Sequence, residues 1–175
     1  MIAEEIHRSI DLSRLPLHTS EMLPRCFPDL KVVARKMERH GQLEIFRSSG
    51  RGKIVYSKDD HHSTHRFTIA HELGHWIFDC GRGRAIPDDW VCVEGSRALP
   101  ERRANFFATE LLVPIRVLHE HVKFTIHPDP EDVDAVGLRD QEIQKIAAWF
   151  NVSFFCAKRR VFELHRFRSD GYLTF

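Results

Sequence analysis

The sequence predicts an α+β fold that is mainly helical, with a small β-sheet or hairpin and a helix-turn-helix-like unit towards the carboxyl end. Three observations support this class. Apolar residues recur at intervals of three and four in two long segments, 66–79 and 99–113, as on one face of a helix. Two short apolar runs, 43–46 and 53–56, flank a Gly-containing stretch that is typical of a hairpin. Further on, two helical segments meet at the tight turn 151–153.

Length and composition are those of an ordinary globular domain. A chain of 175 residues can bury its own core, and its formal net charge of +1 indicates neither nucleic-acid nor membrane binding. No apolar run approaches the roughly 18 residues of a membrane-spanning helix, and the first residues lack the apolar run of a signal peptide. The four cysteines have no CxxC spacing. We therefore expect a cytoplasmic protein with reduced thiols.

The amino-terminal part is expected to contain one helix before the hairpin. Residues 1–27 read as an irregular or partly helical lead-in, interrupted by prolines. Asp29–His40 is predicted as a helix that ends at Gly41. Its apolar face would consist of Leu30, Val33, Ala34 and Met37. The two hairpin strands follow this helix.

The segment Arg66–Asp79, RFTIAHELGHWIFD, is predicted to form a helix over about 64–79. Ser63 or Thr64 can cap its start, and Gly81 follows its end. No proline interrupts it. Its buried side would contain Phe67, Ala70, Leu73 and Ile77.

This helix carries an HExxH motif. Positions i and i+4 lie on one helical face, so His71 and His75 can offer two imidazoles to a single cation. Glu72 is close enough to reach a water bound to that cation without ligating it. The alternative is a chance match on a solvated helix, because the motif fixes only three positions. The apolar spacing around the motif favours a metal site.

A catalytic zinc site needs a third protein ligand and one position open to water. The segment 99–114, LPERRANFFATELLVP, is predicted as a helix bounded by its two prolines. Glu101 lies in its first turn, and Asn105 shares its face and could accept the free N–H of a ligating histidine. Glu101 could also be an ordinary acidic residue of a helix start, and Glu110, off this face, is a rival ligand that we interpret as solvated or salt-bridged. The buried stripe would be Ala104, Phe107, Ala108 and Leu111.

Together, RFTIAHELGHWIFD and ERRANFFATELLVP resemble the ImmA/IrrE family of zinc metallopeptidases. That family pairs rFTlAHElgH with a later ExxANxFAxxLLxP, and this chain has both motifs in that order. The resemblance implies a zincin-like, thermolysin-like core in which His71, His75 and Glu101 bind zinc and Glu72 is the general base. Many relatives have a second acid just before the alanine of the later motif. This chain has Arg103 there, which leaves Glu101 as the candidate ligand.

The resemblance also implies a function. Members that act as bacterial or phage regulators cut a helix-turn-helix repressor and release its target genes. We expect a zinc-dependent, site-specific endopeptidase controlling stress, phage or mobile-element genes, with one zinc ion, or another divalent metal such as manganese, as cofactor. Its partner would be a protein substrate, without membrane or nucleic acid. In thermolysin-like enzymes a strand beside the HExxH helix holds extended substrate by its edge, and either hairpin strand could do so here; a plain structural hairpin is the alternative.

Two further features are less specific. The tract DDHHSTH at 59–65 could bind an extra metal, although such histidines are more often solvated; one of them, or Tyr56, could stabilise the oxyanion. Cys80–Ala98 is predicted as a loop with a short strand at Trp90–Val93, and Thr125–Gly137 as an acidic loop.

The core is expected to span residues 1–124, and a carboxyl-terminal helical unit 125–175 would pack on it within one compact domain. A helix over Ile115–Phe124 precedes the acidic loop. The helix-turn-helix-like pair would comprise a helix over Gln141–Phe150 and a last helix, capped by Ser153, through about Leu164. The inward residues of the first would be Ile143, Ile146, Ala147 and Phe150, and a terminal hairpin would turn at Ser169-Asp170-Gly171.

Two other functions remain open at this point. The chain could be a non-catalytic, metal-stabilised regulator or an antitoxin-like binding module, but such a module has no need of Glu72. It could also be a DNA-binding regulator through a basic cluster in its last helices, namely Lys158, Arg159, Arg160, Arg166 and Arg168. We favour a packing unit with a solvated basic face, because the chain is nearly neutral.

Overall fold

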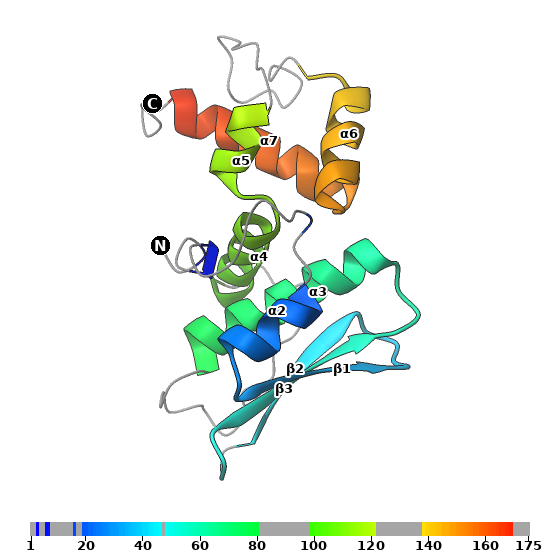
Figure 1. Cartoon of the computed structure of the whole chain (residues 1–175), viewed down its shortest axis with the longest axis vertical. Coiled ribbons are helices and arrows are strands. Elements are labelled where there is room, and N and C mark those ends of the chain that lie inside the picture. The colour runs from blue at the N-terminus through cyan, green and yellow to red at the C-terminus, as the bar shows by residue number, and fades with distance from the viewer. Residues whose placement is uncertain are drawn as a thin grey trace. The chain divides into compact units, whose positions relative to one another are not determined.

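The structure, a computed structural model, describes residues 3, 6–7, 16, 19–46, 48–80, 99–121 and 138–169 (Figure 1). The chain divides into two units, Met1–Leu112 and Val113–Phe175. Sequence reasoning puts the boundary later, at 124/125. None of the described helices is long and apolar enough to cross a membrane.

The first unit contains a three-stranded sheet in the order β1-β3-β2. The strands are β1 (Leu30–Arg35), β2 (Gly41–Phe46) and β3 (Arg51–Ser57). β2 and β3 form the predicted antiparallel hairpin, with Leu43 opposite Ile54, and Gly50 adopts a positive φ of 66° in its turn. β1 pairs in parallel with β3. The small sheet among helices confirms the α+β class.

The helix predicted over Asp29–His40 is wrong, because β1 occupies its first half. Leu30 is buried, Lys31 is exposed, and Ala34, which a helical face would have buried, is exposed. Val32 and Val33 are β-branched and suit a strand, and the backbone of β1 finds its hydrogen-bond partners on β3. A short apolar run fits either period, and pairing with β3 decides between them here.

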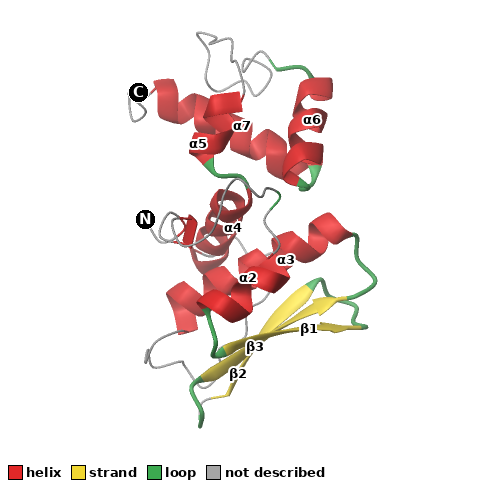
Figure 2. Ribbon diagram, in the orientation of Figure 1, coloured by secondary structure: helices red, strands yellow, loops and turns green. Residues whose placement is uncertain are grey.

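The first unit also contains the helices α2 (Thr19–Cys26), α3 (His62–His75) and α4 (Leu99–Leu112). α3 continues as the π-helical turn η1 (Trp76–Cys80). Helices α2 and α3 lie on one face of the sheet (Figure 2). Every residue of α3 from Thr68 to His75 is buried, because α3 packs between the sheet and α4. Of the predicted buried side, Ala70 and Leu73 are buried, whereas Phe67 and Ile77 are half-buried. The burial of α3 therefore extends beyond a single apolar stripe.

The start of α3 differs from the prediction. His61 is the N-cap, and its Nδ1 accepts a hydrogen bond from the backbone N–H of Ser63 at 3.3 Å. Ser63 and Thr64, the predicted caps, are already inside the helix. Gly81, expected after its end, lies outside the described residues.

The second unit contains α5 (Ile115–His121), α6 (Asp140–Phe150) and α7 (Phe154–Ser169). The predicted inward face of α6 is buried, namely Ile143, Ile146, Ala147 and Phe150. Asn151 ends α6 with φ 50°, and Ser153 Oγ accepts a hydrogen bond from the Cys156 N–H at 3.2 Å, as its predicted capping role requires. The helix-turn-helix-like pair is thus present.

The end of the chain differs from the prediction in one respect. α7 runs to Ser169, so residues 166–169 are helical and the hairpin predicted there is wrong for them. Three predicted segments fall outside the described residues: the loop and strand within 81–98, the acidic loop with the end of the preceding helix within 122–137, and residues 170–175.

Arg160 does not belong to an exposed basic cluster. Its side chain is fully buried, its Nε–H donates to the Val113 carbonyl at 2.8 Å, and its Nη1 pairs with Glu163 at 3.0 Å. Arg159 also pairs with Glu163, and Lys158 lies 3.9 Å from an Asp140 carboxylate oxygen. Of the predicted DNA-contacting residues, Arg160 is therefore a packing residue of the second unit.

Candidate metal centre

α3 presents two histidines to one point. His71 and His75 are one helical turn apart, and both are buried, with 7% and 0% of their surface exposed. Their rings meet edge to face with centroids 4.7 Å apart, and the two Nε2 atoms are separated by 3.1 Å. The i, i+4 spacing thus has the geometric result expected from the sequence.

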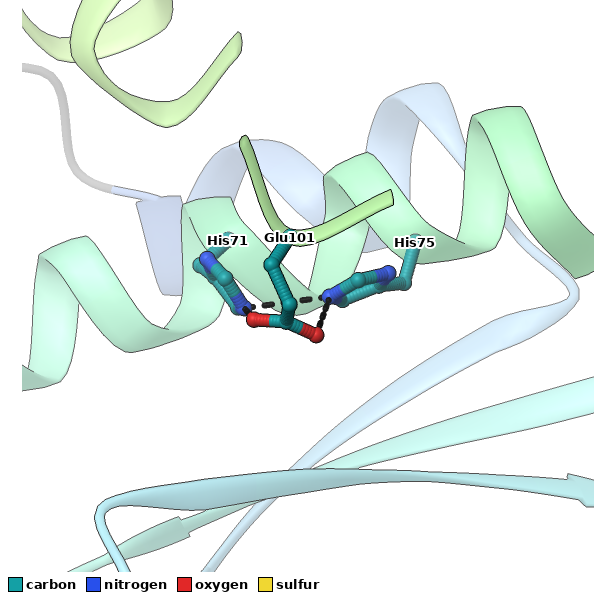
Figure 3. A group of neighbouring side chains, drawn as sticks. All are labelled: His71, His75 and Glu101. Carbon is teal, nitrogen blue, oxygen red and sulfur yellow. Dashed lines mark hydrogen bonds and ion pairs between the residues drawn. The ribbon is translucent and has the colours of Figure 1, made fainter. Parts of the chain in front are cut away.

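α4 brings a carboxylate to the same point (Figure 3). Glu101 Oε2 lies 3.4 Å from His71 Nε2, and Glu101 Oε1 lies 3.2 Å from His75 Nε2. One atom from each residue can be chosen so that all lie within 4.8 Å of one another, the spacing of ligands around one cation. Glu101, in the first turn of α4, is only 4% exposed. The rival Glu110 is not in this group.

A glycine inside the HExxH motif allows α4 to come this close. A Cβ at Gly74 would lie 3.0 Å from Ala104 Cα, 3.2 Å from a ring carbon of Phe107 and 3.3 Å from Ala104 Cβ. Carbon atoms in contact normally lie about 3.5–4.0 Å apart. The missing side chain at 74 therefore lets α4 pack against α3 at the level where Glu101 reaches the histidines. In the HExxH pattern, Gly74 is only one of the two variable positions.

Each histidine ring is oriented by a second hydrogen bond. The Nδ1–H of His71 donates to Asn105 Oδ1 at 3.0 Å, which is the contact predicted for Asn105. The Nδ1–H of His75 donates to Asp79 Oδ2 at 2.8 Å, and the other oxygen of Asp79 pairs with the Arg103 guanidinium. Such outer partners fix the tautomer and the ring orientation of a ligating histidine.

Sequence reasoning missed Asp79 as a partner of the site. Asp79 follows His75 by four residues, which places both on one helical face, but this spacing alone does not predict a contact between them. Asp79 lies in the π-helical turn η1, and a turn of this kind inside a helix is often found at functional sites. Arg103 also lies 5.1 Å from the centroid of the Phe78 ring, so its guanidinium is held between a carboxylate and an aromatic face.

The hydrogen bonds make the centre suited to a cation. With both Nδ1 atoms used as donors, the neutral form of each ring leaves its Nε2 unprotonated, and both Nε2 atoms face the Glu101 carboxylate. Burial is the main cause that lowers the pKa of His71 below its usual 6.5, and it favours the neutral form of this ring. Three electron-rich atoms therefore face one buried point, and a divalent cation there would satisfy all of them.

Glu72 lies next to this group. It is 4% exposed and follows His71 on α3. Its Oε1 would lie 3.6 Å from a Cβ at Gly41, the first residue of β2. The general base expected from the sequence is therefore beside the start of an edge strand of the sheet.

The histidine tract before α3 forms no comparable group among the residues described. Tyr56 packs against His65, with ring centroids 4.9 Å apart, and His40 pairs with Asp60 at 2.8 Å. Burial raises the pKa of Cys80, at the end of η1, to about 12, so this thiol is protonated at neutral pH and is a poor ligand. The predicted oxyanion role of Tyr56 or a tract histidine stays a prediction.

A comparison with models of protein families gives a match over most of the chain. The family model Peptidase M78, described as the IrrE N-terminal-like domain, matches residues 28–162. The match includes β1, the hairpin, α3 and α4, and it continues into α7. A comparison with curated proteins found no match.

Proposed function

The chain belongs to the Peptidase M78 family of IrrE N-terminal-like domains, and on this premise we propose that it is a zinc-dependent, site-specific endopeptidase. The observation that carries the proposal is the convergence of His71 Nε2, His75 Nε2 and the Glu101 carboxylate, one residue from Glu72. Two neutral imidazoles, one carboxylate and an adjacent second carboxylate form the donor set of a catalytic zinc site. Manganese is an alternative cofactor.

In the proposed reaction, Glu72 accepts a proton from the attacking water. The water oxygen forms a bond to the carbonyl carbon, the carbon–nitrogen bond breaks, and Glu72 delivers the proton to the leaving amine. The bound cation would supply the Lewis acid that acidifies the water and polarises the carbonyl. Asn105 and Asp79 keep the two histidine rings in the tautomer that leaves Nε2 available.

The substrate would lie along β2. The sheet order makes β2 an edge strand, paired only with β3 in the described sheet, and its first residue is beside Glu72. An extended peptide could pair with the open edge of β2 and carry its backbone past Glu72. We propose a helix-turn-helix repressor as the protein that contributes this segment, and cutting it would release its target genes.

The test compares two isosteric variants on one substrate set. Repressors encoded next to this chain, and peptides from a whole-proteome digest, are incubated with the zinc-loaded chain, and mass spectrometry maps the cuts. We expect cutting that a chelator stops and added zinc restores. Glu72→Gln should bind zinc and cut nothing, whereas Glu110→Gln, the same change in a half-buried residue of α4, should cut as the parent does. Cutting by Glu72→Gln at the parent rate would remove the general-base role, and no cutting by the parent would leave a metal-binding module.

A further inference from the structure

A concave site lies at the hairpin end of the sheet. It is a cavity of about 440 Å³ formed where β1 begins, β2 ends and the hairpin turns. Its lining includes Asp29, Lys31, Phe46, Ser49 and Arg51. Charged, hydroxyl and aromatic groups therefore surround one hollow, apart from the candidate metal centre.

Two cations of the cavity are available to a ligand. Lys31 and Arg51 are exposed, and neither forms an ion pair with any residue that the structure describes. Lys53, opposite Lys31 in the strand register, is instead neutralised by Glu44 at 2.5 Å. The two available cations outnumber the single carboxylate of Asp29, so the cavity favours an anionic group.

The cavity also offers an apolar surface. The Phe46 side chain lines the cavity and is 45% exposed. It stands opposite Arg51 in the strand register, and Lys53 Nζ lies 5.4 Å from its ring centroid. An exposed ring beside two available cations suits a peptide segment that places a carboxylate next to an apolar side chain.

β2 connects this cavity to the candidate metal centre. Gly41, at one end of β2, lies beside Glu72, and Phe46, at the other end, lines the cavity. A strand advances about 3.3 Å per residue, so the five steps between them span roughly 17 Å. An extended substrate paired with the open edge of β2 would therefore reach Phe46, on the β2 side of the cavity, about five residues from the bond beside Glu72.

We propose that this cavity is a specificity subsite that binds an acidic residue, with a neighbouring apolar side chain, about five residues from the cleaved bond of a protein substrate. The proposal rests on the peptidase function proposed above. Lys31 and Arg51 hold the carboxylate, and Phe46 contacts the apolar side chain. Because the site is distant from Glu72, it selects substrates without taking part in the chemistry.

Binding is tested first, without cleavage, on the full chain carrying Glu72→Gln. The probes are a fluorescein-labelled Gly/Ser peptide with a central Glu-Leu-Asp and the same peptide with Gln-Leu-Asn, followed by fluorescence anisotropy. We expect the acidic peptide to bind more tightly, with an affinity that falls as salt is added. The further change Lys31→Gln/Arg51→Gln should weaken it by about tenfold or more, since two charge-assisted hydrogen bonds are lost.

A matched control removes the same charge elsewhere. Lys36→Gln/Arg39→Gln changes two exposed cations in the β1–β2 connection, outside the cavity lining, and should leave peptide affinity unchanged. Equal binding of the two peptides, or equal effects of the two double variants, would overturn the proposal. Tighter, Lys31- and Arg51-dependent binding of a thymidine oligonucleotide would overturn it too, because the cavity would then serve nucleic acid.

Cleavage mapping separates this proposal from the peptidase function. In cuts made by the zinc-loaded chain, acidic residues should be enriched about four to six positions from the cut, and Lys31→Gln/Arg51→Gln should remove that enrichment. Zinc- and Glu72-dependent cuts without the enrichment would refute the subsite and leave the peptidase intact. Acidic-peptide binding at the cavity without any cutting would refute the peptidase and reduce the cavity to a peptide-docking site.

Discussion

The glycine at position 74 controls how closely α4 approaches α3, and Gly74→Ala should therefore impair metal binding more than stability. The added Cβ would lie 3.0 Å from Ala104 Cα, and normal contact would require α4 to move by about 0.5 Å. Alanine gains about 1 kcal/mol in helix propensity, whereas overpacking costs about 1–3 kcal/mol. The free energy of unfolding of the metal-free chain should thus fall by about 0–2 kcal/mol.

Metal affinity should respond more strongly. Glu101 is one turn before Ala104 on α4 and moves with it, and a metal site tolerates errors of only about 0.2 Å in ligand distances. We expect zinc affinity to fall at least about tenfold, or about 1.4 kcal/mol, and Gly74→Val to lose more. The assay is zinc competition with a chromogenic chelator, combined with urea unfolding.

A control variant separates this effect from loss of stability. Leu111→Ala, at a fully buried position of the same helix, should cost about 2–5 kcal/mol of stability and leave zinc affinity nearly unchanged. The reasoning about Gly74 is refuted if Gly74→Ala keeps parental zinc affinity while its stability rises by the propensity gain alone.

Three further changes probe other parts of the molecule. Asp79→Asn should weaken zinc binding by about tenfold, because His75 loses its charged partner, whereas Asp60→Asn, at the His40 pair, should not change the affinity. In the metal-free chain, the pKa of His71 is lower in the folded state than in the unfolded state, so the unfolded state binds more protons than the folded state as the pH falls below 6.5. The free energy of unfolding, measured with urea, should therefore decline below this pH, and His71→Asn should make the decline smaller. Ser153→Ala should destabilise the second unit by about 1 kcal/mol in thermal unfolding, through loss of its cap, without changing zinc affinity.

The parts of the molecule that could be predicted from sequence are those governed by local periodicity. Four-residue spacing puts His71 and His75 on one face of α3, and the same spacing puts Glu101 and Asn105 on one face of α4. Strong apolar stripes likewise located α4 and α6. These features depend on residues within one or two turns of each other, so the sequence alone contains the information.

The parts that could not be predicted depend on contacts between elements. β1 was expected as a helix because its apolar spacing fits both periods, and only its pairing with β3 decides the outcome. The role of Gly74 depends on how closely α4 approaches, and the role of Asp79 depends on a π-helical turn. No residue pattern in the sequence predicts either feature. Arg160 was expected in a surface basic cluster, because nothing near it in the sequence indicates that it donates a hydrogen bond to the Val113 carbonyl.

The buried side chain of Arg160 limits where the chain can be truncated to isolate its carboxyl-terminal unit. Arg160 donates to the carbonyl of Val113, which is the first residue of the second unit. This unit therefore begins before the acidic segment 125–137, where the sequence suggests a domain boundary. A fragment beginning at 125 would lack both α5 and that acceptor, leaving a buried donor unmet at a cost of about 1–3 kcal/mol. Any truncation meant to isolate the last helices should therefore retain Val113.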